Sequence, residues 1–143
     1  MARRPVAWVG AIVLLAEAVG IALLNWILGS VVDNQDMSLA GLDPRAMTVS
    51  TWIAGALIGG YLALCAFVMA RAAARDSAPG NFGRILLISC AVVHALLGAF
   101  CVGLVGWAAF AFMMVVLGLI VLTLVAYEKK AQQALAPTAA TTP

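Results

Sequence analysis

The feature that most constrains the fold is a long segment without charge. From Ile85 to Tyr127, 43 consecutive residues include no Asp, Glu, Lys or Arg. As one helix this segment would be about 65 Å long, roughly twice the thickness of the hydrocarbon core of a bilayer. We therefore expect a hairpin of two membrane-spanning helices. Its reversal is expected within 103–106, where Gly103 and Gly106 tolerate the backbone angles of a tight turn.

Composition indicates that lipid surrounds the rest of the chain as well. The protein is 65% hydrophobic and 10% charged, with a mean hydropathy of +1.10. A soluble domain is about half apolar and about a quarter charged, so this chain has too little polar surface to cover a core in water. The lipid bilayer is thus its first expected partner.

Two more spans are expected before the hairpin. An apolar run from Val6 to Val32 is interrupted only by Glu17 and Asn25, and it is long enough to cross with some tilt. Asp43–Pro44 reads as an N-cap followed by proline at the first helical position. The sequence therefore predicts an all-α, integral membrane four-helix bundle with spans at about 6–32, 50–70, 85–102 and 107–127. Residues 1–130 would form a single transmembrane domain, and 131–143 a disordered cytoplasmic tail.

The first apolar run also has features of a signal peptide. Arg3 and Arg4 provide a basic start, and residues 16–18 (Ala-Glu-Ala) mimic a cleavage site. Cleavage there would leave residues 19–32, which are too few to span a bilayer. An uncleaved first helix is therefore the favoured interpretation.

The basic residues predict the orientation. Seven fall on one side of the expected spans and only Arg45 falls on the other, which places both ends of the chain and the 71–84 connection in the cytoplasm and the 33–47 loop outside. All four tryptophans lie near span ends, where indole rings favour the headgroup level. This pattern fits a bacterial cytoplasmic (plasma) membrane. The seven residues are Arg3, Arg4, Arg71, Arg75, Arg84, Lys129 and Lys130.

Small residues mark two faces for helix packing. Gly55 and Gly59 form a GxxxG motif in the second span, and Ala91, Ala95 and Ala99 recur at every fourth position in the third. Such faces allow the close backbone approach on which association in lipid depends. They predict packing within the chain, with homodimerisation or a larger membrane complex as the alternative.

Three polar residues are expected near the middle of the membrane. Counted from the nearest cytoplasmic arginine at ~1.5 Å per residue, Glu17 lies at about 20 Å depth, and Tyr61 and His94 at about 15 Å. An ionisable side chain in hydrocarbon is costly, so an inward orientation is favoured. The hypothesis is that Glu17, Tyr61 and His94 meet and share hydrogen bonds.

The surroundings of Glu17 support a second interpretation. Residues 15–25 (Leu-Ala-Glu-Ala-Val-Gly-Ile-Ala-Leu-Leu-Asn) resemble the first helix of small multidrug resistance transporters. The resemblance implies a four-helix protein whose single embedded glutamate exchanges protons for cationic drugs. It covers about a dozen residues. The acidic outer loop, His94 and the charge-free last hairpin depart from that family's pattern.

Motifs for other chemistry are not found in the sequence. The three cysteines lie in apolar runs without CxxC spacing, and a single histidine argues against a multi-histidine metal or haem site. The acidic residues of the 33–43 loop lack the spacing of an EF-hand. No phosphate-binding or nucleophile motif occurs. We therefore expect no enzyme activity, no metal or other cofactor, and no nucleic-acid partner.

The sequence thus leaves two functions open. The first is an accessory or scaffold subunit of the membrane without catalysis, in which the polar cluster only holds helices in register. The alternative is a small proton-coupled transporter that uses Glu17.

Overall fold

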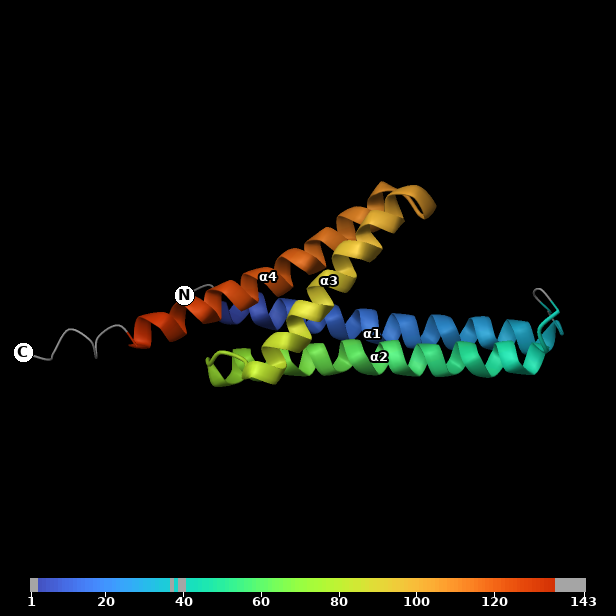
Figure 1. The fold of residues 1–143 in the computed structure, drawn as a ribbon, viewed down its shortest axis with the longest axis horizontal. Coiled ribbons are helices and arrows are strands. Elements are labelled where there is room, and N and C mark those ends of the chain that lie inside the picture. The colour runs from blue at the N-terminus through green and yellow to red at the C-terminus, as the bar shows by residue number, and fades with distance from the viewer. Residues whose placement is uncertain (1–2, 37, 39–40, 136–143) are drawn as a thin grey trace, which may run out of the picture. The chain divides into compact units, whose positions relative to one another are not determined.

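The computed structural model describes residues 3–36, 38 and 41–135, and these form four α-helices (Figure 1). They are α1 (Arg3–Asn34), α2 (Pro44–Arg75), α3 (Asn81–Leu104) and α4 (Trp107–Leu135). All four are long and apolar enough to cross a membrane. The prediction of an all-α chain with four such helices is confirmed, and each predicted span lies within one helix. Closure of the four into one bundle stays a prediction.

The start of α2 follows from its capping residue. The backbone N–H of Arg45 donates a hydrogen bond to Oδ1 of Asp43 at 2.9 Å, and the N–H of Met47 donates to the Asp43 carbonyl at 3.1 Å. Pro44 occupies the first helical position, where its missing N–H costs nothing. The predicted helix start at Pro44 is confirmed.

The connection between α2 and α3 is shorter than the predicted 71–84 loop. Helix α2 continues to Arg75, and α3 begins at Asn81. Three consecutive alanines, 72–74, favour this extra helical turn because alanine has the highest helix propensity. The end of α2 is a Schellman motif, in which Asp76 has a φ of +47° and the N–H of Ser77 donates to the Ala72 carbonyl at 3.3 Å. Arg71, Arg75 and Arg84 are therefore helical residues.

The hairpin of α3 and α4 reverses where the sequence predicts. Helix α3 ends at Leu104, and Gly106 has a φ of +118°, a conformation that L side chains rarely adopt. The N–H groups of Val105 and Gly106 both donate to the Cys101 carbonyl, at 3.0 and 2.7 Å. Helix α4 then includes residues 131–135, which the sequence analysis assigned to the tail. The remainder of the predicted tail lies outside the described residues.

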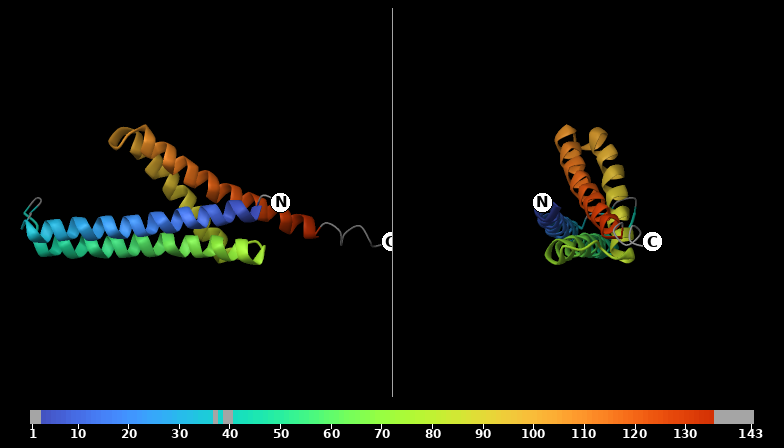
Figure 2. Two further views of the ribbon diagram at one scale, coloured as in Figure 1. Left: turned by 180° about the vertical axis from the view of Figure 1, so that it is seen from behind. Right: turned by 90° about the vertical axis from the view of Figure 1, so that its left-hand side faces the viewer.

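The chain divides into two compact units, which are described separately. The first contains Met1–Val13 and Cys65–Pro143. Within it, α3 and α4 pack as an antiparallel pair (Figure 2). The buried positions of both helices recur at intervals of three and four residues, the spacing of a continuous helical seam. They are Gly83, Leu87, Cys90, Ala91, His94 and Gly98 on α3, and Val116, Ile120, Thr123 and Tyr127 on α4.

The second unit, Leu14–Leu64, is a hairpin formed by the later part of α1 and the earlier part of α2. Its helices approach closely at glycines. A Cβ atom on Gly59 would lie 3.1 Å from the Ala18 carbonyl oxygen, and one on Gly55 would lie 2.5 Å from the Asn25 Cβ. Close backbone approach of this kind increases van der Waals contact between helices.

Two tryptophans stack across the two helices of this hairpin. The rings of Trp26 and Trp52 stack with centroids 5.2 Å apart and planes 17° apart. The indole N–H of Trp52 donates to the Trp26 carbonyl at 3.2 Å, and a Cβ on Gly29 would collide with the Trp52 ring. The stack therefore joins the two helices in one register.

Candidate functional site

Glu17 and Tyr61 lie at one level of the second unit. Gly59 of α2 contacts the backbone of Ala18, the neighbour of Glu17 on α1, and Tyr61 follows Gly59 by two residues. Both side chains are half-buried. The membrane depths estimated for Glu17 and Tyr61 from the sequence stay predictions.

His94 belongs to the first unit, where it is 1% exposed on α3. Its Nδ1 lies 2.8 Å from the Cys90 carbonyl oxygen and 3.6 Å from Cys90 Sγ. Because a carbonyl only accepts, Nδ1 is the donor in its contact with Cys90. The meeting of Glu17, Tyr61 and His94 stays a prediction, since His94 lies in a different unit from the other two.

The predicted packing positions divide into two groups. Gly55 and Gly59 face α1 within the second unit. On α3, Ala91 is 9% exposed, whereas Ala95 and Ala99 are exposed. The buried face of α3 is thus rotated toward Cys90, His94 and Gly98.

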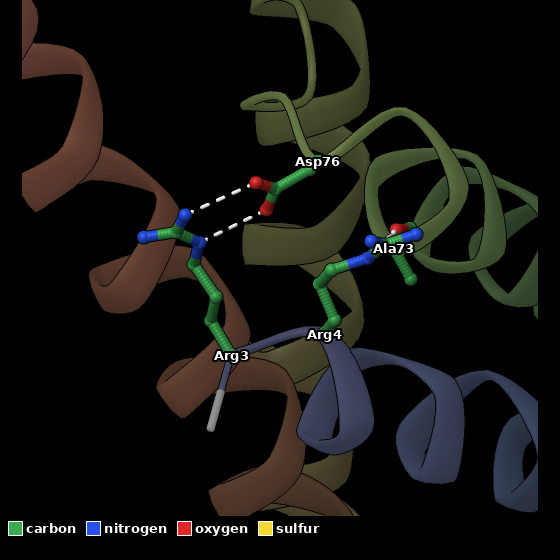
Figure 3. A network of polar contacts seen from close by, with 4 residues as sticks. All are labelled: Arg3, Arg4, Ala73 and Asp76. Atoms are coloured by element: carbon green, nitrogen blue, oxygen red, sulfur yellow. Dashed lines mark hydrogen bonds and ion pairs between the residues drawn. The ribbon is translucent and has the colours of Figure 1, made fainter. Parts of the chain in front are cut away.

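A polar junction that was not predicted from the sequence joins the start of α1 to the end of α2. Arg3 donates two hydrogen bonds to the Asp76 carboxylate, from Nε at 2.9 Å and from Nη2 at 3.0 Å (Figure 3). Arg4 donates from Nε to the Ala73 carbonyl at 3.1 Å. The Asp76 hydrogen bond raises the pKa of Arg3, which precedes the predicted span, so its guanidinium stays charged. Arg4 thereby satisfies a backbone carbonyl at the carboxyl end of α2, and both arginines place positive charge at the negative end of its helix dipole.

Tyr127 of α4 is buried beside this junction. Its side chain is 0% exposed and packs with Ala7, Ala72 and Ala73, which joins three helices in one small apolar cluster. Among the described residues, its hydroxyl has no hydrogen-bond partner. A lone aspartate in a basic connection hints at this junction, but nothing in the sequence singles out Tyr127.

A second ion pair joins α3 to α4. Arg84 Nη2 lies 2.9 Å from Glu128 Oε1, and both side chains are about half exposed. The pair lies beside a shallow cavity of about 200 Å³ that is also lined by Ala78, Pro79, Asn81 and Leu124. The two charged side chains in the lining of this cavity pair with each other.

No metal-binding arrangement is found in the described part of the chain. Within it, no three His, Cys, Asp or Glu side chains lie close enough to hold an ion. The cysteines are free, with Cys65 and Cys90 buried and Cys101 half-buried. The expectation of a protein without metal or cofactor stays a prediction.

Comparison with known proteins returned no match among protein-family models, curated protein sequences or solved structures. The local resemblance of residues 15–25 to small multidrug resistance transporters therefore assigns no family to this chain.

Proposed function

We propose that this protein is a four-span integral membrane protein that serves as an accessory or scaffold subunit and has no catalytic centre of its own. The observation that carries the proposal is the apolar exterior of its helices. Only 17–33% of the most apolar window of each helix is buried within the protein. Lipid tails and the helices of other membrane proteins are the surfaces that such an exterior fits.

The way in which polar side chains are satisfied supports a role without catalysis. A catalytic centre needs polar groups that converge on one space. Here the side chains of several helical residues donate to the carbonyl four residues earlier in their own helix, so their polarity is used locally. These residues are Asn25, Ser30, Thr48, Thr51 and Thr123.

The proposed orientation has both ends of the chain and the 76–80 connection in the cytoplasm of a bacterial cell, with the α1–α2 connection outside. Its test uses single cysteines placed at Ala78 or Ser38 and a membrane-impermeant maleimide applied to intact spheroplasts. We expect labelling at position 38 and protection at position 78 until the membrane is opened. The reverse pattern would contradict the orientation. The background variant replaces Cys65, Cys90 and Cys101 with alanine.

The accessory role is tested by identifying the proteins that bind this chain in the membrane. We expect cross-linking in intact membranes, followed by purification in mild detergent, to recover a larger membrane protein in fixed stoichiometry. The same preparation from cells that lack this chain identifies background proteins. Recovery of the chain alone, or only as a homodimer, would argue against the accessory role.

A second candidate function is proton-coupled transport through Glu17. It is favoured by the position of Glu17, a half-buried carboxyl side chain in the middle of an apolar helix and level with Tyr61. In proteoliposomes with an imposed pH gradient, Glu17→Gln is expected to abolish uptake of a lipophilic cation. The control Asp33→Asn, at an exposed position in the last turn of α1, is expected to leave uptake unchanged. Uptake that survives Glu17→Gln would exclude this mechanism.

A further inference from the structure

The arginines on the predicted cytoplasmic side differ in what they contact. Arg3 binds the Asp76 carboxylate, Arg4 binds the Ala73 carbonyl and Arg84 binds Glu128. Asp76 and Glu128 are the two acidic residues that the sequence contains after Arg71. Each acid on this side is therefore already engaged by an arginine.

Arg71 and Arg75 have no such partner. In the part of the chain that the structure describes, neither side chain forms a hydrogen bond or an ion pair, and both are exposed. They lie one turn apart on the last turns of α2 and so on the same face. Like charges at this spacing repel each other, and an anion placed between them relieves that repulsion.

The helix surface next to the two arginines is apolar. Phe67 lies one turn before Arg71 on the same face and is 60% exposed. The arginines are at the cytoplasmic end of the predicted span 50–70, and Phe67 lies just within it. This face thus has a cationic end at headgroup level and an apolar surface at acyl-chain level.

We propose that Arg71 and Arg75 bind the phosphate of an anionic phospholipid of the cytoplasmic leaflet, with an acyl chain of that lipid lying on Phe67. Guanidinium groups recognise phosphate oxygens through paired, charge-assisted hydrogen bonds. Each cationic residue close to an anionic membrane surface strengthens attraction by roughly fivefold. The site goes beyond the accessory role, because it would fix where α2 sits in the headgroup layer whatever other protein is bound.

The experiment measures lipid binding to the full-length chain in detergent by native mass spectrometry. Phosphatidylglycerol and phosphatidylcholine with identical acyl chains are supplied at equal concentration. The unaltered chain is expected to prefer phosphatidylglycerol, and Arg71→Gln/Arg75→Gln to lose about 25-fold of that preference. The matched control, Arg45→Gln/Lys129→Gln, removes two charges from other exposed positions and is expected to keep it. Equal losses in the two double variants would overturn the site.

Two further measurements separate a lipid site from a simple anion site or a folding defect. Inorganic phosphate at millimolar concentration is expected not to displace phosphatidylglycerol, and Phe67→Ser is expected to weaken its binding severalfold. Full displacement by phosphate would overturn the lipid as the ligand. If the glutamine variant fails to insert, Arg71→Lys/Arg75→Lys keeps both charges but loses the paired hydrogen bonds. Undiminished preference in that lysine variant would equally overturn the proposal.

Discussion

At the scale of single residues, the N-terminal arginines and Tyr127 have structural roles that their positions in the sequence do not reveal. Arg3 and Arg4 would orient the first span as cytoplasmic cations, and they also satisfy the end of α2 through Asp76 and the Ala73 carbonyl. Tyr127 contributes a buried ring to the same junction. The residues that are predicted to set the topology therefore also join helices.

Tyr127 provides a prediction at this scale. Its hydroxyl is buried without a partner in the described part of the chain, and such a group costs about 1–3 kcal/mol of desolvation. Tyr127→Phe keeps the ring and removes that cost, so we expect unchanged or higher stability, by up to about 1 kcal/mol, in thermal unfolding in detergent. Tyr127→Ala also removes the ring and is expected to lose about 3 kcal/mol or more. Clear destabilisation by Tyr127→Phe would indicate that the hydroxyl has a partner.

At the scale of helices, glycines decide how closely neighbouring segments approach. Gly59 lies against the Ala18 backbone, whereas its neighbour Gly60 has no atom within 4 Å of the place where a Cβ would be. Both residues are glycines at adjacent positions of α2, and they differ in the face of the helix that they occupy. Helix packing in the second unit therefore depends on one side of α2.

This contrast predicts the effect of substitution in the α1–α2 hairpin. Gly59→Leu must separate α1 from α2, because backbone cannot move aside as a flexible side chain can, and we expect a loss of about 1–3 kcal/mol. The matched variant Gly60→Leu is expected to change stability by less than about 0.5 kcal/mol. Thermal unfolding of both variants in one detergent measures the difference, and similar losses at both positions would contradict the described packing.

The turn between α3 and α4 is a second prediction at this scale. Gly106 has a φ of +118°, whereas Gly103 is helical and has open space around it. Gly106→Ala places a Cβ in a disfavoured backbone conformation and is expected to cost about 1–2 kcal/mol. Gly103→Ala should be neutral or slightly stabilising, because alanine favours helix. If thermal unfolding ranks the two variants in the opposite order, the described turn is wrong.

At the scale of the whole molecule, exposed apolar side chains predict how the protein behaves in cells. Large exposed hydrophobic residues occur on all four helices. We expect the protein to stay in the membrane pellet after extraction with alkaline carbonate and to enter solution only with detergent. A peripheral membrane protein from the same cells serves as the control. Release of this chain by carbonate, as a monomer without detergent, would exclude a spanning protein.

Local features of the sequence were sufficient to predict the helices. The charge-free segment 85–127 requires a reversal, Gly106 permits one, and Asp43–Pro44 begins α2, because each of these effects acts over a few neighbouring residues. The main local discrepancy is at the ends of α2 and α4, which extend further than the apolar spans. The predicted spans end where the apolar residues end, whereas a helix can continue through the polar residues that follow.

Which face of each helix is buried was decided only by the tertiary structure. Ala95 and Ala99 were expected to pack and are exposed, whereas His94 and Tyr127 are buried. In a soluble helix the apolar stripe points to the core. Here nearly every helix face is apolar, so the pattern of hydrophobic residues does not indicate which face is buried. The sequence therefore determined the position of each residue along its helix. The rotation of that helix, and with it the pairing of Arg3 with Asp76, depended on the neighbours that packing brought into contact.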